Sequence, residues 1–281
     1  MHVLIAGCGW LGCAVAERLL ARGDRVTGIR SDPGRAEHLR ELGIEPLAVD
    51  LAEPASRTQI PKDVDAILAL QAARGEGEAA YRRAYLDANR TLLDFARQQT
   101  VRAFVYTGST GLFGQTDGAD VDELTPPQPA TVSGTLLEAA EQAILAEAAD
   151  GLPTRIVRLS GLYGPGRLWL IDRVRRGLMT MGAGDEAWMN ACHQDDAVTT
   201  VLAALDRGRD GAVYHATDIE PMRRREVITF LAERLGVSAV RLETGSGLAG
   251  PNRRILATKT RQELGISCRW PSLREGLEPY L

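Results

Sequence analysis

Three glycines near the N-terminus have the spacing of a phosphate-binding turn. Gly7, Gly9 and Gly12 form the pattern GxGxxG between an apolar run at 3–6 and a helical pattern at 11–21. The first glycine permits a tight turn, the second lets a pyrophosphate approach backbone N–H groups, and the third lets helix and strand lie close. The helix N-terminus adds partial positive charge. The pattern therefore predicts a bound dinucleotide, unless the glycines serve only a close turn.

The end of the second predicted strand indicates which dinucleotide is bound. An acidic residue there accepts from free ribose hydroxyls, whereas a basic residue pairs with a 2′-phosphate. Arg30 offers a planar charged group that suits a phosphate, and Ser31 adds a hydroxyl. We therefore expect NADP, with NAD as the second choice if Arg30 is a solvated surface residue and Asp32 accepts from the ribose. Asp50, at the end of the next strand, is expected to accept from the adenine amino group.

The elements that must position these residues alternate between strand and helix. Short apolar runs that end in glycine or polar residues predict buried strands, and apolar residues at helical spacing predict the helices between them. This alternation predicts a doubly wound α/β fold with a parallel sheet, the Rossmann fold. The predicted strands are 3–6, 25–29, 46–49, 66–70, 103–107 and 155–159, and the predicted helices are 11–21, 36–42, 78–98 and 135–149.

The alternation breaks after residue 160. We expect a dinucleotide-binding domain over 1–160 and a smaller mixed substrate lobe over 161–281, with about 191–216 returning to the sheet. The segment 114–129 is rich in proline and acidic residues, which predicts a surface loop without regular structure. Further helices are predicted at 198–205, 225–235 and 259–264.

The composition is that of an ordinary globular protein. The chain has 281 residues, 44% hydrophobic and 25% charged, with 33 basic and 37 acidic side chains and a net charge of −4. No basic stripe recurs, so counterion release gives no support for a nucleic acid partner. Four cysteines without CxxC spacing predict neither a disulfide framework nor a metal site, which is typical of a cytoplasmic protein. The apolar run at 3–6 is too short for a signal peptide or membrane segment.

Several segments, in a fixed order, resemble the extended short-chain dehydrogenases, the group that contains NAD(P)-dependent epimerases and dehydratases of nucleotide sugars. The resemblance covers most of the chain. Residues 108–114 are similar to the family's SSxSVYG stretch, and Asn190, His193 and Asp196 are similar to its N-x-x-H-x-x-D stretch. Other landmarks are the glycine turn, Asp50-Leu51, Arg158 followed by Tyr163-Gly164-Pro165-Gly166-Arg167, and the ending Leu273-Arg274-Glu275-Gly276-Leu277.

The resemblance implies a nicotinamide cofactor and a serine that binds the substrate oxygen, here Ser109. The family's proton partner is a tyrosine whose pKa is lowered by a lysine four residues later. This chain has no YxxxK motif and places Ser133 and Leu137 at those positions. A serine is far less acidic than a phenol, and a leucine cannot lower a pKa by its charge. The cofactor contacts that the resemblance implies beyond the glycines are Trp10, Leu11, Leu51, Leu70, Gln71 and Ser160.

Two residues are candidate replacements for the missing tyrosine. Tyr163 follows the sixth strand, and His193 titrates near neutral pH. Each has a structural alternative: Tyr163 as a packing residue of the Tyr-Gly-Pro turn, and His193 as a histidine held beside an aspartate. An arginine cluster, Arg167, Arg173, Arg175 and Arg176, either holds an anionic small-molecule substrate or is the solvated face of a helix.

The residues support two functions. The first is an NADP-dependent oxidoreductase or epimerase/dehydratase that acts on a sugar nucleotide or similar hydroxyl or carbonyl compound. The second is an NADP(H)-binding sensor or scaffold with little turnover. The retained Ser109 segment favours the first, and the absent tyrosine and lysine favour the second. The sequence leaves the oligomeric state open; a homodimer is one alternative, since relatives often pair through the helices that correspond to 78–98 and 131–149.

Overall fold

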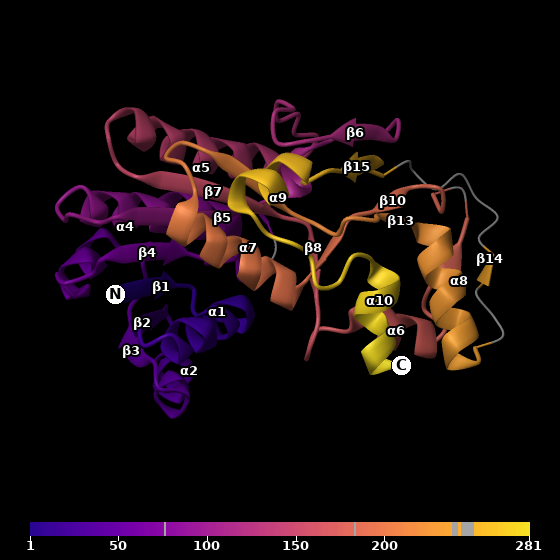
Figure 1. The fold of residues 1–281 in the computed structure, drawn as a ribbon, viewed down its shortest axis with the longest axis horizontal. Coiled ribbons are helices and arrows are strands. Elements are labelled where there is room, and N and C mark those ends of the chain that lie inside the picture. Colours follow the sequence, from indigo (N-terminus) through magenta and orange to yellow (C-terminus); the bar gives the residue numbers. More distant parts are fainter. Residues whose placement is uncertain (76, 183, 238–240, 243–249) are drawn as a thin grey trace. The chain divides into compact units, whose positions relative to one another are not determined.

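A seven-stranded parallel sheet is the main element of the fold (Figure 1). The computed structural model describes every residue except 76, 183, 238–240 and 243–249. The strand order confirms the doubly wound α/β fold, because β1 lies inside the sheet, between β4 and β2, and the chain adds strands on both sides of it. In order across the sheet, the strands are β12 (Val213–Ala216), β7 (Thr154–Leu159), β5 (Ala103–Ser109), β4 (Ala66–Ala69), β1 (His2–Ala6), β2 (Arg25–Arg30) and β3 (Glu45–Ala48).

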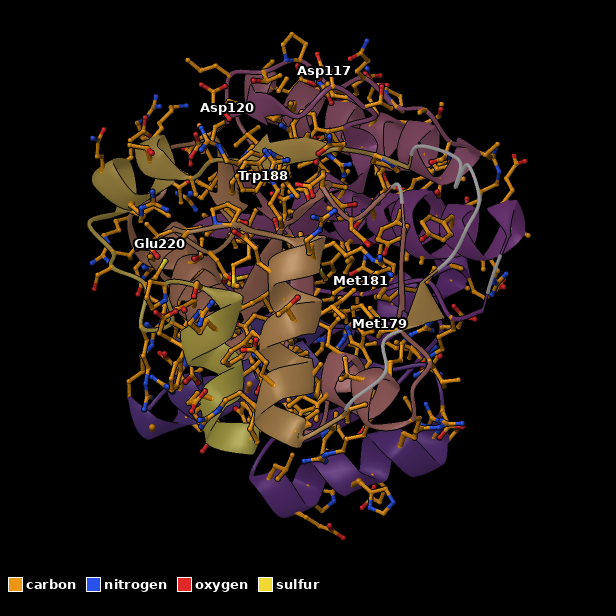
Figure 2. The ribbon with its side chains drawn as sticks, turned by 90° about the vertical axis from the view of Figure 1, so that its right-hand side faces the viewer. Asp117, Asp120, Met179, Met181, Trp188 and Glu220 are labelled. Atoms are coloured by element: carbon orange, nitrogen blue, oxygen red, sulfur yellow. The ribbon has the colours of Figure 1, made fainter. Side chains whose placement is uncertain are left out.

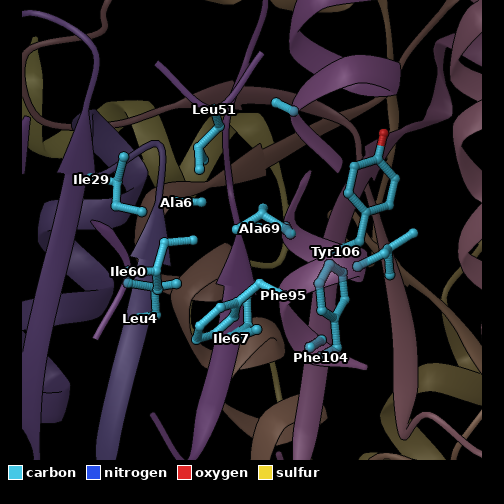
Figure 3. Close-up of a cluster of buried hydrophobic side chains, with 14 of the residues drawn as sticks. Leu4, Ala6, Ile29, Leu51, Ile60, Ile67, Ala69, Phe95, Phe104 and Tyr106 are labelled. Carbon is cyan, nitrogen blue, oxygen red and sulfur yellow. The ribbon is translucent and has the colours of Figure 1, made fainter. Parts of the chain in front are cut away.

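Both faces of the sheet are buried, as a continuous apolar strand predicts. Leu4 and Ala6 of β1 belong to one hydrophobic cluster (Figure 3), which also contains side chains of α4 (Ala88–Ala96) and α5 (Val132–Ala149). The alternate residues Val3 and Ile5 are fully buried as well. They point to the opposite face, where α1 (Trp10–Ala21) contacts β1 and β2.

Helix starts follow local capping chemistry. The Asp32 side chain accepts from the Arg35 N–H at 2.7 Å, and Pro33 occupies the first position of α2 (Pro33–Glu37). This cap begins the helix earlier than the predicted residue 36, and a 3₁₀ turn at His38–Leu42 completes it. Thr131 caps α5 in the same way by accepting from the Gly134 N–H at 3.0 Å.

The helix predicted over 78–98 is interrupted in its hydrogen-bonding pattern. It consists of α3 (Glu78–Tyr81), a π-helical segment at Arg82–Asp87, and α4. Asn89 follows the π-helical segment, and its side chain donates to the Tyr85 carbonyl at 2.7 Å. Such π-helical turns are frequent next to functional sites.

The chain divides into two compact units. The first comprises Met1–Leu112, Pro129–Arg158 and Val198–Tyr214, and the second comprises Phe113–Gln128, Leu159–Ala197 and His215–Leu281. The sequence analysis expects a boundary at residue 160 and a returning segment over about 191–216. In the structure the returning segment is 198–214, and residues 113–128, expected in the first domain, belong to the second unit.

The second unit is built from short strand pairs and helices, which makes it mixed. β6 (Ala119–Val121) pairs with β15 (Arg253–Ile255), so the prediction that 114–129 has no regular structure is wrong at its centre. A strand far away in the sequence supplies the ladder, which local composition cannot reveal. The other pairs are β8 (Gly161–Tyr163) with β11 (Ala191–His193), β10 (Trp188–Met189) with β13 (Met222–Arg223), and β9 (Thr180–Met181) with β14 (Arg241–Leu242).

The helices of the second unit pack around their own hydrophobic cluster. That cluster contains Leu170, Ile171, Phe230 and Leu231, together with the aromatic ring of Tyr163. The helices are α6 (Trp169–Arg175), α8 (Arg224–Leu235), α9 (Thr258–Leu264) and α10 (Leu273–Leu277), while α7 (Gln194–Arg207) begins in the second unit and continues into the first.

Candidate functional site

The glycine turn connects β1 to α1, and its three glycines have distinct reasons to be glycine. Gly7 has a φ of +75°, and a Cβ there would lie 2.3 Å from the Gln71 Cα. A Cβ at Gly12 would lie 2.9 Å from the Gly7 carbonyl oxygen, so helix and strand meet closely there. At Gly9 a Cβ would meet nothing closer than 3.8 Å, which leaves that position open. The first turn of α1 also contains no acidic residue, and the arrangement fits a pyrophosphate.

Arg30 ends β2 and lies against this turn. Its Nε donates to the Cys8 carbonyl at 2.6 Å. The next residue, Ser31, accepts through its hydroxyl from Nη1 of Arg74 at 3.3 Å. Two guanidinium groups and a hydroxyl thus gather where the adenosine ribose is expected, and together they suit a 2′-phosphate. Asp32, the alternative ribose acceptor, already uses one carboxylate oxygen to cap α2.

Arg74 and Arg83 also lie near the expected cofactor site, and no sequence motif indicates either of them. Arg74 lies in the loop after β4. Since the carboxyl ends of adjacent parallel strands meet at one edge of a sheet, a basic residue in that loop was the sequence signal for a second guanidinium near the cofactor. Arg83 lies in the π-helical segment and donates to Asp50 at 2.7 Å. Asp50 also accepts from the Ala52 N–H at 3.0 Å. The Asp50 carboxylate is solvent-exposed and retains acceptor capacity, so an amino group remains a possible partner.

Gln71 follows β4 and faces the glycine turn. Its Nε2 donates to the Asn89 side chain at 2.7 Å. Its Oε1 is buried and has no hydrogen-bond partner among the residues that the structure describes. An unpaired buried acceptor destabilises a fold, so this oxygen fits a donor from a bound ligand. Of the other predicted contacts, Trp10 is half-buried, and three are buried leucines: Leu11, Leu51 and Leu70.

Ser109 ends β5 with its hydroxyl oriented by the following turn. The hydroxyl oxygen accepts from the Gly111 N–H at 3.0 Å. The hydroxyl proton therefore stays available to donate to another oxygen. A Cβ at Gly111 would lie 3.2 Å from the Ser109 Oγ and 3.9 Å from the Leu137 Cδ1, which places the start of α5 beside this serine.

The two positions that depart from the family pattern lie on α5. Ser133 is half-buried, and its hydroxyl lies 3.0 Å from that of Thr131. Leu137 is buried, so an aliphatic side chain occupies the position where the family has an ammonium group. The Ser133 hydroxyl therefore has no adjacent lysine on this helix face to lower its pKa.

A buried ion pair lies under Gly108, next to Ser109. Arg158 donates through Nε and Nη2 to Glu141, the closest contact being 2.8 Å. A Cβ at Gly108 would lie 2.6 Å from the Glu141 Oε1, so glycine is required above this carboxylate. Tyr106 is fully buried, and burial together with the Glu141 charge raises the pKa of its hydroxyl. The landmark arginine of the family pattern thus neutralises a carboxylate inside the first unit.

Tyr163 and His193 lie together in the second unit, and both are satisfied there. The Tyr163 hydroxyl donates to the Ser272 carbonyl at 3.3 Å and lies against Gly276, where a Cβ would be 2.0 Å from it. Burial raises the pKa of Tyr163 far above its ordinary value, the reverse of what an acid catalyst needs. These contacts favour the packing role for Tyr163.

The His193 ring has a partner on each nitrogen. Nδ1 accepts from the Asp195 N–H at 3.1 Å, so the neutral ring carries its proton on Nε2 and donates it to the Tyr280 hydroxyl, also at 3.1 Å. Burial lowers the pKa of His193, which favours this neutral form. The geometry favours the structural role over proton transfer.

The other two residues of the N-x-x-H-x-x-D stretch bind the C-terminal part of the second unit. Asn190 donates to the Arg253 carbonyl at 2.8 Å and accepts from the Ile255 N–H at 2.7 Å. Asp196 accepts from the N–H groups of Arg269 at 2.7 Å and Trp270 at 3.0 Å. Together with the His193–Tyr280 bond, these contacts hold the last part of the chain in place.

The arginine cluster lies on and beside α6. Leu170, Ile171 and Val174 form the buried face of this helix, while Arg173, Arg175 and Arg176 are exposed. Arg173 donates to the Leu178 carbonyl at 3.2 Å. This pattern favours a solvated helix face.

Trp188 of β10, labelled in Figure 2, lies between two other arginines of the second unit. The Arg223 guanidinium carbon lies 3.6 Å from its ring centroid and that of Arg254 lies 5.4 Å away.

Ser160 is buried in the same unit, and its hydroxyl has no partner in the described part of the chain, which fits its predicted role as a ligand contact.

Neither a metal-binding cluster nor a membrane-spanning helix is found among the described residues. Outside the gaps at 76, 183, 238–240 and 243–249, no three His, Cys, Asp or Glu side chains come together as a metal site would require. Over the same residues, no helix is both long and apolar enough to cross a bilayer.

Comparison with known proteins finds a family model that matches most of the chain. The family model described as NAD dependent epimerase/dehydratase matches residues 3–219. The protein YeeZ of Escherichia coli K12 is 28% identical over 274 residues, which cover 96% of each chain. A 4-hydroxy-2-methyl-3-oxo-4-farnesyl-3,4-dihydroquinoline-1-oxide ketoreductase of Stigmatella aurantiaca is 27% identical over 83% of this chain and 72% of its own.

Among solved structures, the fold is similar to that of a UDP-glucose 4-epimerase from Thermotoga maritima. The two superpose with a TM-score of 0.86 at 19% identity, over 99% of this chain and 96% of the epimerase. At this identity the likeness concerns the fold alone.

Proposed function

The chain belongs to the NAD dependent epimerase/dehydratase family, and on that premise we propose that it is an NADP-dependent oxidoreductase of a hydroxyl or carbonyl compound. The observation that carries the proposal is the open glycine turn with Arg30 beside it and Arg74 bonded to Ser31. Guanidinium groups bind phosphate through charge-assisted hydrogen bonds, whereas a ribose with free hydroxyls gains little from them. This arrangement favours a 2′-phosphate and hence NADP over NAD.

The residues around Ser109 support a role in polarising a substrate oxygen. The bound nicotinamide would supply or accept a hydride at the carbon that carries this oxygen. Ser109 donates its hydroxyl proton to the oxygen, while the Gly111 N–H holds the serine oxygen in place. Ser133, hydrogen-bonded to the exposed Thr131, stands where the family has its acid. Because no lysine activates that hydroxyl, we expect slow turnover.

The substrate class follows from relatives only. The Stigmatella relative is named a ketoreductase, and the matching family model is that of NAD dependent epimerases and dehydratases, the group whose resemblance to this chain implies nucleotide-sugar substrates. A sugar nucleotide or a ketone of comparable size is therefore the substrate that we propose.

A second function, dinucleotide binding with little or no turnover, is favoured by one specific observation. None of the three candidate proton donors is activated: Ser133 has the aliphatic Leu137 in place of a lysine, and Tyr163 and His193 are hydrogen-bonded inside the second unit. In this case the protein senses NADP(H) or presents a surface that depends on its binding.

Titration with NADPH and NADH, followed by quenching of tryptophan emission, tests the cofactor. Arg74→Ala removes an exposed guanidinium whose described bond is to Ser31. Since a hydrogen bond to a charged group contributes about 1.5–3 kcal/mol, we expect about 10–100-fold weaker NADPH binding and unchanged NADH binding. Arg82→Ala, which removes an exposed arginine paired with Glu78, is the matched control. If both Arg74→Ala and Arg30→Ala bind NADPH as tightly as the parent protein does, the NADP assignment is refuted.

Hydride transfer separates the two functions. NADPH deuterated at nicotinamide C4 is incubated with the protein and with oxidised UDP-sugars and a panel of ketones, each of which has a carbonyl that can accept a hydride, and deuterium in the products is measured by mass spectrometry. The oxidoreductase proposal predicts transfer that Ser109→Ala abolishes. Tight NADPH binding without transfer to any of these compounds would support the binding function instead.

A further inference from the structure

Two of the four cysteines lie in and next to the glycine turn, and they contact each other. Cys8 is fully buried inside the turn, and Cys13 is half-buried in the first turns of α1. The Cys13 thiol donates to the Cys8 carbonyl oxygen at 3.5 Å, and the two side chains are close enough to shift each other's pKa. The Arg30 Nη2 lies 3.7 Å from the same sulfur. The turn therefore holds a solvent-reachable sulfur between a guanidinium and a second, buried thiol.

This geometry makes the two sulfurs chemically different. The interaction with Cys8, together with the bond and charge of Arg30, lowers the pKa of Cys13 below its ordinary value, so more of this sulfur is thiolate at neutral pH than in a free cysteine. The same interaction and the burial of Cys8 raise the pKa of Cys8. Cys268 of the second unit is also half-buried, but burial raises its pKa to about 11. Cys268 is thus a matched internal reference for accessibility.

We propose that Cys13 and Cys8 form a thiol oxidation site, in which Cys13 attacks hydroperoxides and Cys8 is the resolving cysteine. In the first step the Cys13 thiolate attacks a peroxide oxygen: the S–O bond forms, the O–O bond breaks, and hydroxide leaves. In the second step Cys8 loses its proton to that hydroxide and attacks the Cys13 sulfur; the S–S bond forms and the sulfenic oxygen leaves as hydroxide, which is protonated by solvent. Two thiols are oxidised to one disulfide, and one peroxide is reduced to two waters.

The second step is possible because oxidation of Cys13 removes the interactions that raise the pKa of the Cys8 thiol. The largest cause of the raised pKa of Cys8 is its side-chain interaction with Cys13, and the Cys13 charge contributes as well. Both disappear when Cys13 becomes a neutral sulfenic acid. The remaining Arg30 charge lowers the pKa of Cys8. The cluster therefore favours disulfide formation over further oxidation of Cys13.

The site also has a consequence for dinucleotide binding, and this part rests on the proposed function. Arg30 contacts the Cys13 sulfur with one nitrogen and the Cys8 carbonyl with another, and it is the arginine that we assign to the 2′-phosphate. A disulfide constrains the turn that receives the pyrophosphate. We expect oxidation to weaken NADPH binding about tenfold or more, and bound NADPH to slow the oxidation of Cys13.

The first test needs no variant. The wild-type protein is alkylated with iodoacetamide from pH 5 to pH 10, and the labelling rate of each cysteine is followed by peptide mass spectrometry. We expect a midpoint for Cys13 below that of a free thiol, about 8.5, and labelling at neutral pH at least about tenfold faster than for Cys268. A Cys13 midpoint at or above that of a free thiol, about 8.5, would overturn the proposal.

The second test identifies the product. After treatment with hydrogen peroxide, peptide mapping is expected to show the Cys8–Cys13 disulfide, which dithiothreitol reverses. Cys8→Ala should replace it by sulfinic acid on Cys13, and Cys13→Ser should abolish it, while Cys268→Ser should leave it unchanged. Oxidation that falls equally on Cys268, or no linked peptide in a folded wild-type protein, would refute the pair.

The third test keeps this inference separate from the proposed function. NADPH titration of the reduced and peroxide-treated protein measures the link between the two. If NADPH does not bind to the reduced protein, the proposed function fails, while the alkylation profile and the disulfide still decide the thiol site. If NADPH binds equally to both forms, the link to binding is wrong.

Discussion

Replacing Glu141 by glutamine leaves the Arg158 guanidinium inside the first unit without the carboxylate that it contacts at 2.8 Å. The side chains are 2% and 5% exposed, so bulk water does not replace the lost partner. Breaking a buried pair from one side costs about 3–5 kcal/mol. In a chain of this size that loss lowers the melting temperature by roughly 10 °C.

Urea and thermal unfolding, followed by circular dichroism, measure this effect. The double variant Glu141→Leu with Arg158→Met removes both charges and is expected to recover most of the loss, because an apolar pair of similar size needs no partner. Glu37→Gln, which breaks an exposed pair with Arg40, is the control and should not change the unfolding curve measurably.

Two results would refute the reasoning. One is a Glu141→Gln variant whose free energy of unfolding is within about 1 kcal/mol of the parent. The other is a double variant no more stable than the single one, which would show that the loss comes from packing around Gly108 and not from the uncompensated charge.

Three further predictions concern the turn and the second unit. Gly7→Ala should abolish dinucleotide binding and destabilise the protein more than Gly23→Ala. Both glycines have positive φ, but only a Cβ at Gly7 would meet the backbone of Gln71. Equal melting temperatures of the two variants would contradict this. Asp196→Ala removes the acceptor of two backbone N–H groups and should cost about 2–3 kcal/mol, with faster limited proteolysis after residue 268 than in the parent. Burial lowers the pKa of His193, so at mildly acidic pH the unfolded chain binds a proton that the folded chain does not, and the free energy of unfolding falls as pH falls from 7 to 5. His193→Gln should make this dependence on pH shallower. An identical slope in the variant and the parent would contradict the buried, neutral assignment of His193.

Much of the first unit could be predicted because its signals are local. A continuous apolar run such as 66–69 predicts a strand that is buried on both faces, as it is in the structure, and a cap such as Asp32 acts within its own turn. The second unit was harder to predict. Its strand pairs are two or three residues long and join segments far apart in the chain, as β6 and β15 do, so no single segment carries a strand pattern.

The residues of the candidate site also divide into those that the sequence could identify and those that it could not. The cofactor turn could be identified from glycine spacing alone, since Gly7 and Gly12 are required by contacts with their own strand and helix and with the adjacent Gln71. Arg74 could not be identified, because nothing near it in the sequence indicates that its guanidinium reaches Ser31. The thiol pair was also missed as a pair: the two residues are close in sequence, but their difference depends on Arg30, which arrives from the next strand.

The sequence by itself determined the parallel fold, the dinucleotide turn and the absence of a tyrosine and lysine at residues 133 and 137. These features follow from residue type and spacing over a few positions, where backbone geometry and side-chain size act directly. Only the tertiary structure decided that Tyr163 and His193 are hydrogen-bonded inside the second unit, and that Arg158 neutralises Glu141. The physical reason is that the role of a polar side chain depends on its burial and on the partners within about 3 Å, and distant segments of the chain supply both.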